Sequence, residues 1–410
     1  MILLRKQKGF GNFLLRVGFL FGTVVSLFRL RQFVPVVPLE DARIDLPPSS
    51  ASSASRLQFI HSCNNDSCPL LPQWMKTYFQ WHTQQVQRIS ANPPSQWQQQ
   101  RLLVVRCLEG DRCGGTADRL KSLPLYLALA AKTKRLLFLR WTRPFRLESF
   151  MVPGEVLNWT VPDTLLPFLV DPNNITNKAF FGGKAVVPLV RAAHQSNMWL
   201  VEGAAQMAAA DLFLKIASEL EDTTPPAPVT FFHEMFLALF RPVPALQQLV
   251  EHQMEALDLH PNQFVTAHIR AKYPGEPYRE TWNLTLLQRT VTNAIDCASS
   301  LTHSSLPIYV ASDTLVSLQA AQEYPTQVRV VSHLDAKTLP QQDPPHLNFA
   351  KEDNPSAFFS IFADLFIMSQ SRCVAFGAGG FGRFGSLVSF NASCRVTHSI
   401  QGQLYNCSNI

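Results

Sequence analysis

Outside its first 31 residues, the sequence lacks a surplus of charge of either sign. Six of its 36 Lys and Arg residues precede the first acidic residue, which leaves 30 basic against 30 acidic side chains in the rest of the chain. A protein that binds nucleic acid needs a positive surplus on its folded part to neutralise phosphates. The charge balance therefore argues against nucleic acid as a partner.

The sequence also lacks common metal-binding patterns. It has no Asp-x-Asp and no His-Glu-x-x-His, and none of its eight cysteines shows the Cys-x-x-Cys spacing of a zinc site. These patterns supply the ligands of many enzyme-bound metal ions. We therefore expect no metal cofactor.

An apolar run near the N-terminus is a candidate membrane anchor. It covers Val17 to Phe28, extends backwards through residues 13–15, and has basic residues on both sides. Arg16 interrupts it, but an arginine near one end can reach the membrane surface. No small-x-small cleavage site follows promptly, so we expect residues 1–31 to be a cytoplasmic tail and an uncleaved signal-anchor; a cleaved signal peptide is the alternative. The stronger positive cluster before the run places the N-terminus in the cytoplasm.

Sequons and cysteines favour a lumenal location for the rest of the chain. All eight cysteines lie beyond the anchor, so disulfides are expected. The intervals Cys63 to Cys68 and Cys107 to Cys113 suit local loops, but the sequence leaves every pairing open. Six acceptor sequons for N-glycans begin at Asn65, Asn158, Asn174, Asn283, Asn391 and Asn406.

Composition and the pattern of expected strands and helices divide the remainder into three parts. Residues 32–100 are rich in Pro, Ser and Gln, which predicts a stem that buries no core, with one helix near Trp74 to Val86. Apolar strand-like runs then alternate with helix-like segments, which predicts an α/β fold in two domains, residues 101–245 and 246–410. The expected strands are 102–105, 136–139, 264–269, 307–312, 328–331 and 373–376, and the expected helices are 116–133, 284–298, 314–324 and 356–371.

Polar side chains follow the expected strands of the second domain. His268-Ile269-Arg270 ends one strand, and Ser312 and Asp313 end the next. In open α/β sheets the ligand lies beyond the carboxyl ends of the strands, where an arginine can bind a diphosphate. Asp364 lies in an apolar helix, where a guanine base would offer it two N–H donors. The alternatives are a surface arginine at a strand end and an internal cap or salt bridge.

Two glycine-rich segments are candidate phosphate or substrate sites. Residues 377–382 form a Gly-x-Gly-x-x-Gly, but no Asp or Glu follows Gly382, which argues against a dinucleotide fold. The glycines still let backbone N–H groups approach a phosphate. We therefore include Gly379, Gly380, Arg383 and Ser386 among the candidate binding residues. An earlier turn before the first helix adds Gly114, Gly115, Asp118 and Arg119.

Taken together, these motifs resemble the superfamily of α1,6-, α1,2- and protein O-fucosyltransferases. Its members carry an early Gly-Gly-x-x-(Asn/Asp), a central His-x-Arg, an Ala-Ser-Asp strand end and a late Ser/Gly-rich loop, and this chain has all four in that order between about Arg101 and His398. The resemblance implies a GT-B fold, in which two Rossmann-like domains face a cleft. It further implies that the second domain binds the donor GDP-fucose and that no cofactor is needed.

The resemblance also implies roles for individual residues. Arg270 would bind the β-phosphate, and His268 and Asp364 would contact the guanine. A hydroxyl of a glycan or protein acceptor would attack directly, with inversion at the anomeric carbon. Some relatives have an acid nearby as the base; here Glu276 and Glu280 are approximate substitutes. The expected protein is a Golgi fucosyltransferase, and the alternatives are an inactive lumenal binding protein or a transferase that uses another nucleotide sugar.

The anchor and the sequons together generate a test of topology. If the chain beyond residue 31 is lumenal, protease added to sealed vesicles should remove only the short cytoplasmic tail, and a glycosidase should lower the apparent mass. Immunoblots with and without detergent measure both effects. Degradation of the region beyond Gln100 in sealed vesicles would contradict the lumenal location.

Overall fold

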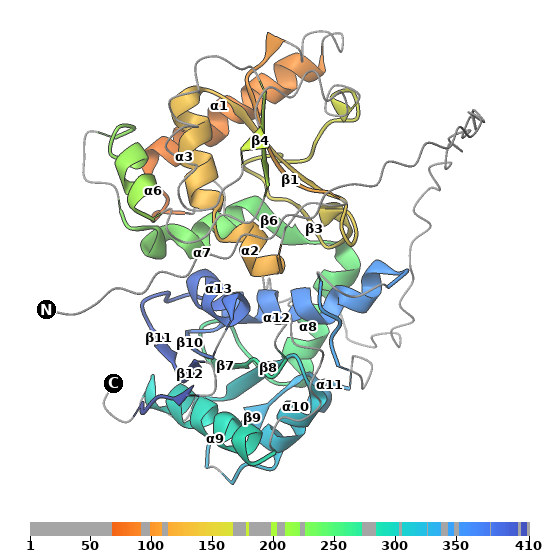
Figure 1. The fold of residues 1–410 in the computed structure, drawn as a ribbon, viewed down its shortest axis with the longest axis vertical. Helices are drawn as coiled ribbons and strands as arrows, with labels where there is room; N and C mark the ends of the chain where they lie inside the picture. The colour runs from red at the N-terminus through yellow and green to blue at the C-terminus, as the bar shows by residue number, and fades with distance from the viewer. Residues whose placement is uncertain are drawn as a thin grey trace, which may run out of the picture. The chain divides into compact units, whose positions relative to one another are not determined.

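The computed structural model describes most of the chain beyond residue 67. Two parallel sheets with helices packed against them dominate this part of the molecule (Figure 1), and all the described residues belong to one compact unit. The described residues are 68–91, 99–108, 114–166, 178–179, 198–202, 210–221, 226–272, 284–302, 306–325, 327–337, 343–347, 352–377, 379–400 and 403–407.

The N-terminal sheet has the strand order β2-β1-β5-β4, with every pair parallel. β1 and β2 are short apolar runs that are buried on both faces, as expected where a parallel sheet is covered on both sides. One of these faces packs with α3 (Leu123–Thr133) in a shared apolar core. The strands are β1 (Leu102–Cys107), β2 (Leu136–Trp141), β4 (Lys178–Ala179) and β5 (Met198–Glu202).

α1 (Gln73–Ser90) packs against the edge strand β2. The Tyr78 hydroxyl donates to the carbonyl of Arg135 at 2.9 Å and accepts from the amide of Leu137 at 3.2 Å. A ring nitrogen of His82 bonds the Leu137 carbonyl at 3.0 Å. These side chains occupy backbone groups that an edge strand otherwise leaves unpaired. The helix predicted in the stem is thus confirmed, but the expectation that the stem buries no core is wrong for residues 73–90.

The C-terminal sheet has the order β11-β10-β7-β8-β9 and is also parallel throughout. Alternate residues of its central strand β7 face one apolar core. Val265, Ala267 and Ile269 pack with α9 (Leu284–Ser300) and α10 (Leu315–Gln322). The strands are β7 (Val265–Ile269), β8 (Ile308–Ser312), β9 (Val330–Val331), β10 (Cys373–Phe376) and β11 (Arg395–Thr397).

The opposite face of this sheet shares its core with the N-terminal half. Tyr309 and Ala311 of β8 belong to the same apolar cluster as Leu103 of β1. α12 (Phe359–Gln370) is central to this cluster, and its Phe362 stacks on Phe150 with ring centroids 4.2 Å apart. The two halves of the described chain are therefore held together by one apolar core rather than by a linker alone.

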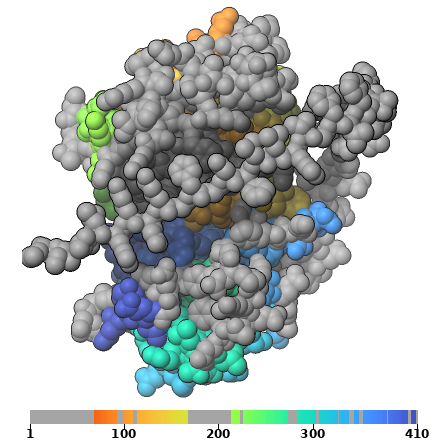
Figure 2. Space-filling view, viewed as in Figure 1, coloured from red at the N-terminus to blue at the C-terminus, as the bar shows by residue number. Residues whose placement is uncertain are grey.

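The remaining elements connect the two sheets or cover them. Several residues of α9 are exposed on the surface of the molecule, and the helix can be seen at the lower end of the space-filling view (Figure 2). The other helices are α2 (Thr116–Leu120), α6 (Ala210–Ala217), α7 (Pro228–Leu239), α8 (Pro244–Ala256), α11 (His333–Ala336), α13 (Gly380–Val388) and the 3-10 helices η2 (Leu147–Ser149) and η5 (Pro355–Phe358); the other strands are β3 (Met151–Pro153), β6 (Phe240–Pro242), β12 (Ser399–Ile400) and β13 (Gln403–Leu404).

The α/β alternation predicted from the sequence is confirmed, with small changes at element ends. All six predicted strands are present as β1, β2, β7, β8, β9 and β10. The helix expected over residues 116–133 is interrupted at residues 121–122 and forms α2 and α3. α7 and α8, which lie where the domain boundary was expected, were not predicted as helices. The division at residue 245 itself stays a prediction.

Two disulfides stabilise the C-terminal sheet and the helix α9 that packs against it. Cys373 at the start of β10 pairs with Cys394 just before β11, and Cys297 of α9 pairs with Cys407. Each of the described cysteines is disulfide-bonded. The expectation of disulfides is therefore confirmed for these residues, while Cys63 and Cys113 lie outside the described residues.

The described sequon asparagines are all exposed, as glycan attachment requires: Asn158, Asn391 and Asn406. Asn65, Asn174 and Asn283 lie outside the described residues, and so does the expected anchor in residues 1–31. Among the described helices, none is long and apolar enough to cross a bilayer.

Candidate active site

Most of the predicted site residues come together in one pocket, although they are spread along the sequence from Gly114 to Gly380. The pocket measures about 280 Å³, near the lower end of the range for small-molecule sites. Residues from both halves of the chain line it. The predicted residues among them are Gly114, Gly115, Asp118, His268, Arg270, Ser312, Asp313, Asp364, Gly379 and Gly380.

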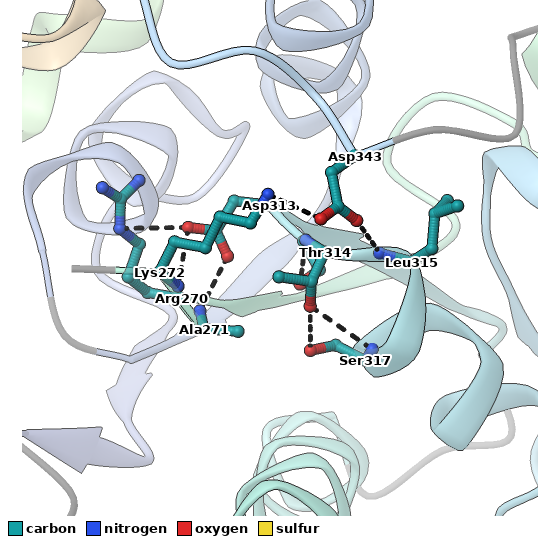
Figure 3. A network of polar contacts seen from close by, with 9 residues as sticks. Arg270, Ala271, Lys272, Asp313, Thr314, Leu315, Ser317 and Asp343 are labelled. Carbon is teal, nitrogen blue, oxygen red and sulfur yellow. Dashed lines mark hydrogen bonds and ion pairs between the residues drawn. The ribbon is translucent and has the colours of Figure 1, made fainter. Parts of the chain in front are cut away.

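Arg270 and Asp313 form an ion pair where β7 and β8 end. The Arg270 Nε lies 3.2 Å from Asp313 Oδ2, and only 15% and 16% of the two side chains is exposed. The same carboxylate accepts hydrogen bonds from the amide of Ala271 at 2.7 Å and from the amide of Lys272 at 3.0 Å. Figure 3 shows that the two terminal nitrogens of Arg270 point away from Asp313. Arg270 is thus fixed through Nε, with both terminal nitrogens directed elsewhere.

The pKa of the Asp313 carboxyl group is raised above its usual value. Burial raises its pKa, while Arg270, the two backbone amides and Lys272 act in the opposite direction. A buried carboxylate with one cation and two N–H donors is well satisfied, so this ion pair holds its geometry rather than exchanging partners with solvent.

His268 is packed too tightly to be a mobile group. It is 4% exposed, and a Cβ on Gly382 would collide with its ring. Burial first, and then Arg270 and His398, lower its pKa to about 3, so the ring is neutral. A ring nitrogen of His398 is hydrogen-bonded to the His268 carbonyl at 2.9 Å, and this bond holds the end of β7 in place.

Asp364 of α12 is a buried carboxyl group in the pocket lining. The hydroxyl of Tyr309 on β8 donates to its Oδ1 at 2.5 Å. Burial raises the pKa of Asp364 to about 7, and the Tyr309 hydrogen bond opposes this shift. Its second oxygen has no hydrogen bond in the described part of the chain. A ligand with N–H groups can therefore bind Asp364 and stabilise its charged form.

The two glycine-rich segments place backbone groups at the pocket. Gly379 has φ +93°, a conformation that favours glycine, and a Cβ there would contact Arg270. Gly380 begins α13, and a Cβ on it would lie 3.5 Å from that of Ala117 in α2. The first turns of α2 and α13 therefore adjoin. The late glycine-rich segment is expected to be a loop. This prediction is wrong from Gly380 onward, because these residues are helical.

Three predicted binding residues do not line the pocket. Arg119 is 1% exposed; its Nε donates to the Gly114 carbonyl at 3.1 Å, and its guanidinium lies 4.8 Å from the ring centre of Trp141. It supports the Gly-Gly turn from within the protein. Arg383 is exposed on α13, and the Ser386 hydroxyl donates to the Arg383 carbonyl at 2.8 Å. Glu276 and Glu280 lie outside the described residues.

Sequence reasoning missed a short segment that also lines the pocket, residues 344–347. Asp343 anchors its start, because its carboxylate accepts from the amide of Leu315 at 2.7 Å and pairs with the ammonium of Lys272 at 2.6 Å (Figure 3). The Asp343-Pro344-Pro345-His346 sequence contains a titratable residue beside two prolines, but nothing in its spacing connects it to the strand ends. Lys272, Thr116, Ile361 and Phe381 line the pocket as well.

Within the described ranges, no three His, Cys, Asp or Glu side chains are grouped as metal ligands would be. The expectation of a metal-free site stays a prediction.

No family model and no curated protein matches this sequence. Solved structures do match its fold. One is a mutant of Arabidopsis thaliana FUT1 in complex with GDP, which is 14% identical over 81% of this chain and 80% of its own, with a TM-score of 0.53. Another is the fucosyltransferase NodZ from Bradyrhizobium, which is 12% identical over 71% of this chain and 94% of its own, with a TM-score of 0.42.

The resemblance to fucosyltransferases that the motifs predict is therefore confirmed at the level of the fold: the described chain has an α/β fold similar to that of a plant fucosyltransferase.

Proposed function

We propose that this protein is an inverting, metal-independent glycosyltransferase that transfers fucose from GDP-fucose to a hydroxyl of a glycan or protein. The observation that carries the proposal is the fixed guanidinium of Arg270 at the end of β7. Asp313, itself held by two backbone amides, pairs with the Nε of this guanidinium, so its two terminal nitrogens are available to an anionic ligand. The similarity in fold to a protein solved with GDP supports a nucleotide-diphosphate donor.

The pocket offers complementary groups for the two ends of such a donor. Asp364 is an acceptor for the N–H edge of a guanine, and Tyr309 orients it. The diphosphate would lie near Arg270 and the first turn of α13, where free backbone N–H groups favour anions. A pocket with a base-binding carboxylate and a phosphate-binding arginine suits a nucleoside diphosphate better than a neutral sugar alone.

The chemistry follows from where charge develops. As the bond between the anomeric carbon and the diphosphate oxygen breaks, the electron pair stays on the β-phosphate. A guanidinium that is already oriented stabilises this charge more strongly in the transition state than in the ground state. Attack by the acceptor hydroxyl from the opposite face inverts the anomeric configuration.

Location is part of the proposal. The anchor-like first 31 residues, the exposed sequon asparagines and the disulfides support a Golgi membrane protein of type II with its folded part in the lumen. Two alternatives make different predictions in binding assays. An inactive lumenal binding protein would bind GDP-fucose without turning it over, and a transferase with another donor would bind UDP more tightly than GDP.

Replacing Arg270 by lysine tests the central interaction. Lysine keeps the positive charge but loses the planar pair of donors. We expect Arg270→Lys to lower GDP-fucose turnover by about a hundredfold or more, the loss typical of one missing donor at a developing oxyanion. GDP release and thermal melting measure the effect. Arg383→Lys is the matched control, because Arg383 is exposed on α13 outside the pocket, and it should behave like the parent. An Arg270→Lys protein that melts normally and keeps its turnover would refute the role of Arg270.

The environment of Asp364 predicts a pH dependence of GDP binding. Its pKa is raised to about 7, and only the charged form accepts from both guanine N–H groups. Affinity should therefore rise through pH 7 and level off above it, and fall as the carboxyl becomes protonated below it. Calorimetric titration with GDP from acidic to mildly alkaline pH measures this.

The Asp364→Asn variant is the control for that titration, since it leaves only the pH dependence of the phosphate groups. It should bind GDP more weakly, and its rise through pH 7 should be smaller by the part that the Asp364 carboxyl contributes. An unchanged affinity and profile in Asp364→Asn would show that this carboxyl does not bind the base.

Metal removal gives an independent test of the mechanism. We expect turnover to survive a strong chelator, because Arg270 supplies the positive charge that a metal ion supplies in metal-dependent transferases. Rates of GDP release before and after chelation provide the measurement. Loss of activity that manganese restores would contradict a metal-free mechanism.

A further inference from the structure

Two neighbouring strands of the N-terminal sheet carry an arginine near their carboxyl ends. Arg106 of β1 and Arg140 of β2 are directly opposite each other in the parallel register. Adjacent strands lie about 4.8 Å apart, and residues in register project from the same face of a sheet. The two side chains therefore leave the sheet side by side. Arg140 also begins the basic segment, residues 140–146, which reads Arg-Trp-Thr-Arg-Pro-Phe-Arg.

Arg140 is surrounded by like charge. Arg106 beside it and Arg146 at the end of the basic segment both lower its pKa, after the larger effect of burial. The acidic residues nearby belong to its neighbours: Glu148 pairs with Arg146 at 3.4 Å, and the register places Glu202 of β5 on the other side of Arg106. Arg140 itself is partly buried and has no hydrogen bond or ion pair with any residue that the structure describes.

The basic segment adjoins the pocket. The Arg119 guanidinium donates from Nε to the carbonyl of Gly114, which lines the pocket, and from Nη1 to the carbonyl of Arg143 at 2.5 Å. Phe145 contacts Phe358, which lies just before α12, with ring centroids 5.9 Å apart. The basic segment therefore lies beside the early Gly-Gly turn and reaches the C-terminal half of the chain.

The positive charge of this segment is separate from the proposed donor site. Arg270 follows the sheet of the C-terminal half, whereas the basic segment follows β2 of the N-terminal sheet. In the proposed reaction the acceptor hydroxyl attacks from the side of the anomeric carbon opposite the diphosphate, so the acceptor approaches from the side away from Arg270. Ligands of α/β sheets lie beyond the carboxyl ends of the strands. The carboxyl edge of the N-terminal sheet is therefore the place for the acceptor.

A guanidinium in this environment favours an acidic ligand. Its planar N–H groups can donate two parallel hydrogen bonds to one anionic group. Arg106 has a partner of its own, so Arg140 provides the donors while Arg106 adds positive charge. Because the two arginines leave the sheet about one strand spacing apart, a single charged group can interact with both. This geometry suits one acidic sugar unit better than a run of acidic residues in a polypeptide.

We propose that the acceptor is an acidic oligosaccharide and that Arg140 binds its carboxylate or sulfate group at the basic segment. The inference rests on the proposed function and names the class of its acceptor. Arg140 selects the acceptor in this scheme and takes no part in bond formation. An acidic group on the acceptor would also offset the repulsion between Arg140 and its two neighbouring arginines.

Binding to an array of oligosaccharides tests the inference if each acidic member has a neutral counterpart. Oligosaccharides with uronic acids are paired with their carboxyl-reduced forms, and sulfated ones with their desulfated forms, so that the two sets distinguish a carboxylate from a sulfate. We expect the full chain to bind the acidic member of at least one pair about tenfold more tightly, the scale of one hydrogen bond to a charged group. A parent chain with no preference for the acidic member of any pair would overturn the inference.

Three variants assign the preference to one residue. Arg140→Gln should lose most of it, and Arg140→Lys should keep part of it, because lysine retains the charge without the planar donors. Arg101→Gln is the matched control, since Arg101 is an exposed arginine just before β1, at the opposite edge of the same sheet, and should keep the preference. Thermal melting shows whether each variant is folded. An Arg140→Gln protein that keeps the preference of the parent refutes the role of Arg140.

The salt dependence of the parent gives a readout that needs no variant. A partly exposed ion pair is screened by salt, so the preference should fall as the ionic strength rises. A preference that salt leaves unchanged contradicts binding through Arg140. Tighter binding of a polyglutamate peptide than of every acidic oligosaccharide would point to a protein acceptor and would also overturn the inference.

GDP assays distinguish failure of the inference from failure of the proposed function. Arg140→Gln should bind GDP within about threefold of the parent, a small change in binding free energy, because Arg140 is not among the residues that line the pocket. If the parent binds GDP and releases it from GDP-fucose but has no preference for acidic oligosaccharides, the inference fails and the proposed function stands. If the parent neither binds GDP nor releases it from GDP-fucose, both fail.

Discussion

The ion pair between Asp313 and Arg270 is the interaction on which the geometry of the site depends. One buried carboxylate at the end of β8 accepts hydrogen bonds from two consecutive amides after β7 and forms an ion pair with the Nε of Arg270. It therefore sets both the path of the chain leaving β7 and the direction of the guanidinium. Removing the carboxylate would leave a buried cation and two amides without partners, which is costly in a poorly solvated site.

The pocket exists because the two halves share a core. α12 contributes apolar residues to that core and presents Asp364 to the pocket from the same helix. The adjoining first turns of α2 and α13 bring the early and late glycine segments together. A change in the packing of these helices would therefore move Asp364 and the glycine segments relative to Arg270, since side chains on rigid elements follow the backbone that carries them.

Most of the charged side chains around the pocket are paired with one another. Asp313 pairs with the Nε of Arg270, and Asp343 pairs with the ammonium of Lys272. The terminal nitrogens of Arg270 are therefore the main cationic group for a ligand. The neutral rings of His268 and His346 add no competing positive charge. The pocket thus has one fixed cationic group at a defined place, and burial raises the pKa of its carboxyl group on α12 to about 7.

The sequence by itself determined the strands, because short apolar runs between polar turns can be buried only in a parallel sheet with both faces covered. It also determined which polar residues follow those strands, and parallel strands bring their carboxyl ends to one edge, so Arg270, Ser312 and Asp313 were predictable as neighbours. Only the tertiary structure decided the rest. Arg119 turns into the protein because Trp141 and the Gly114 carbonyl lie there, and His346 reaches the pocket because Asp343 is bound to α10 and Lys272. α1 belongs to the core because β2 is an edge strand that needs partners. These placements depend on contacts between residues far apart in the chain, and local composition and periodicity carry no record of such contacts.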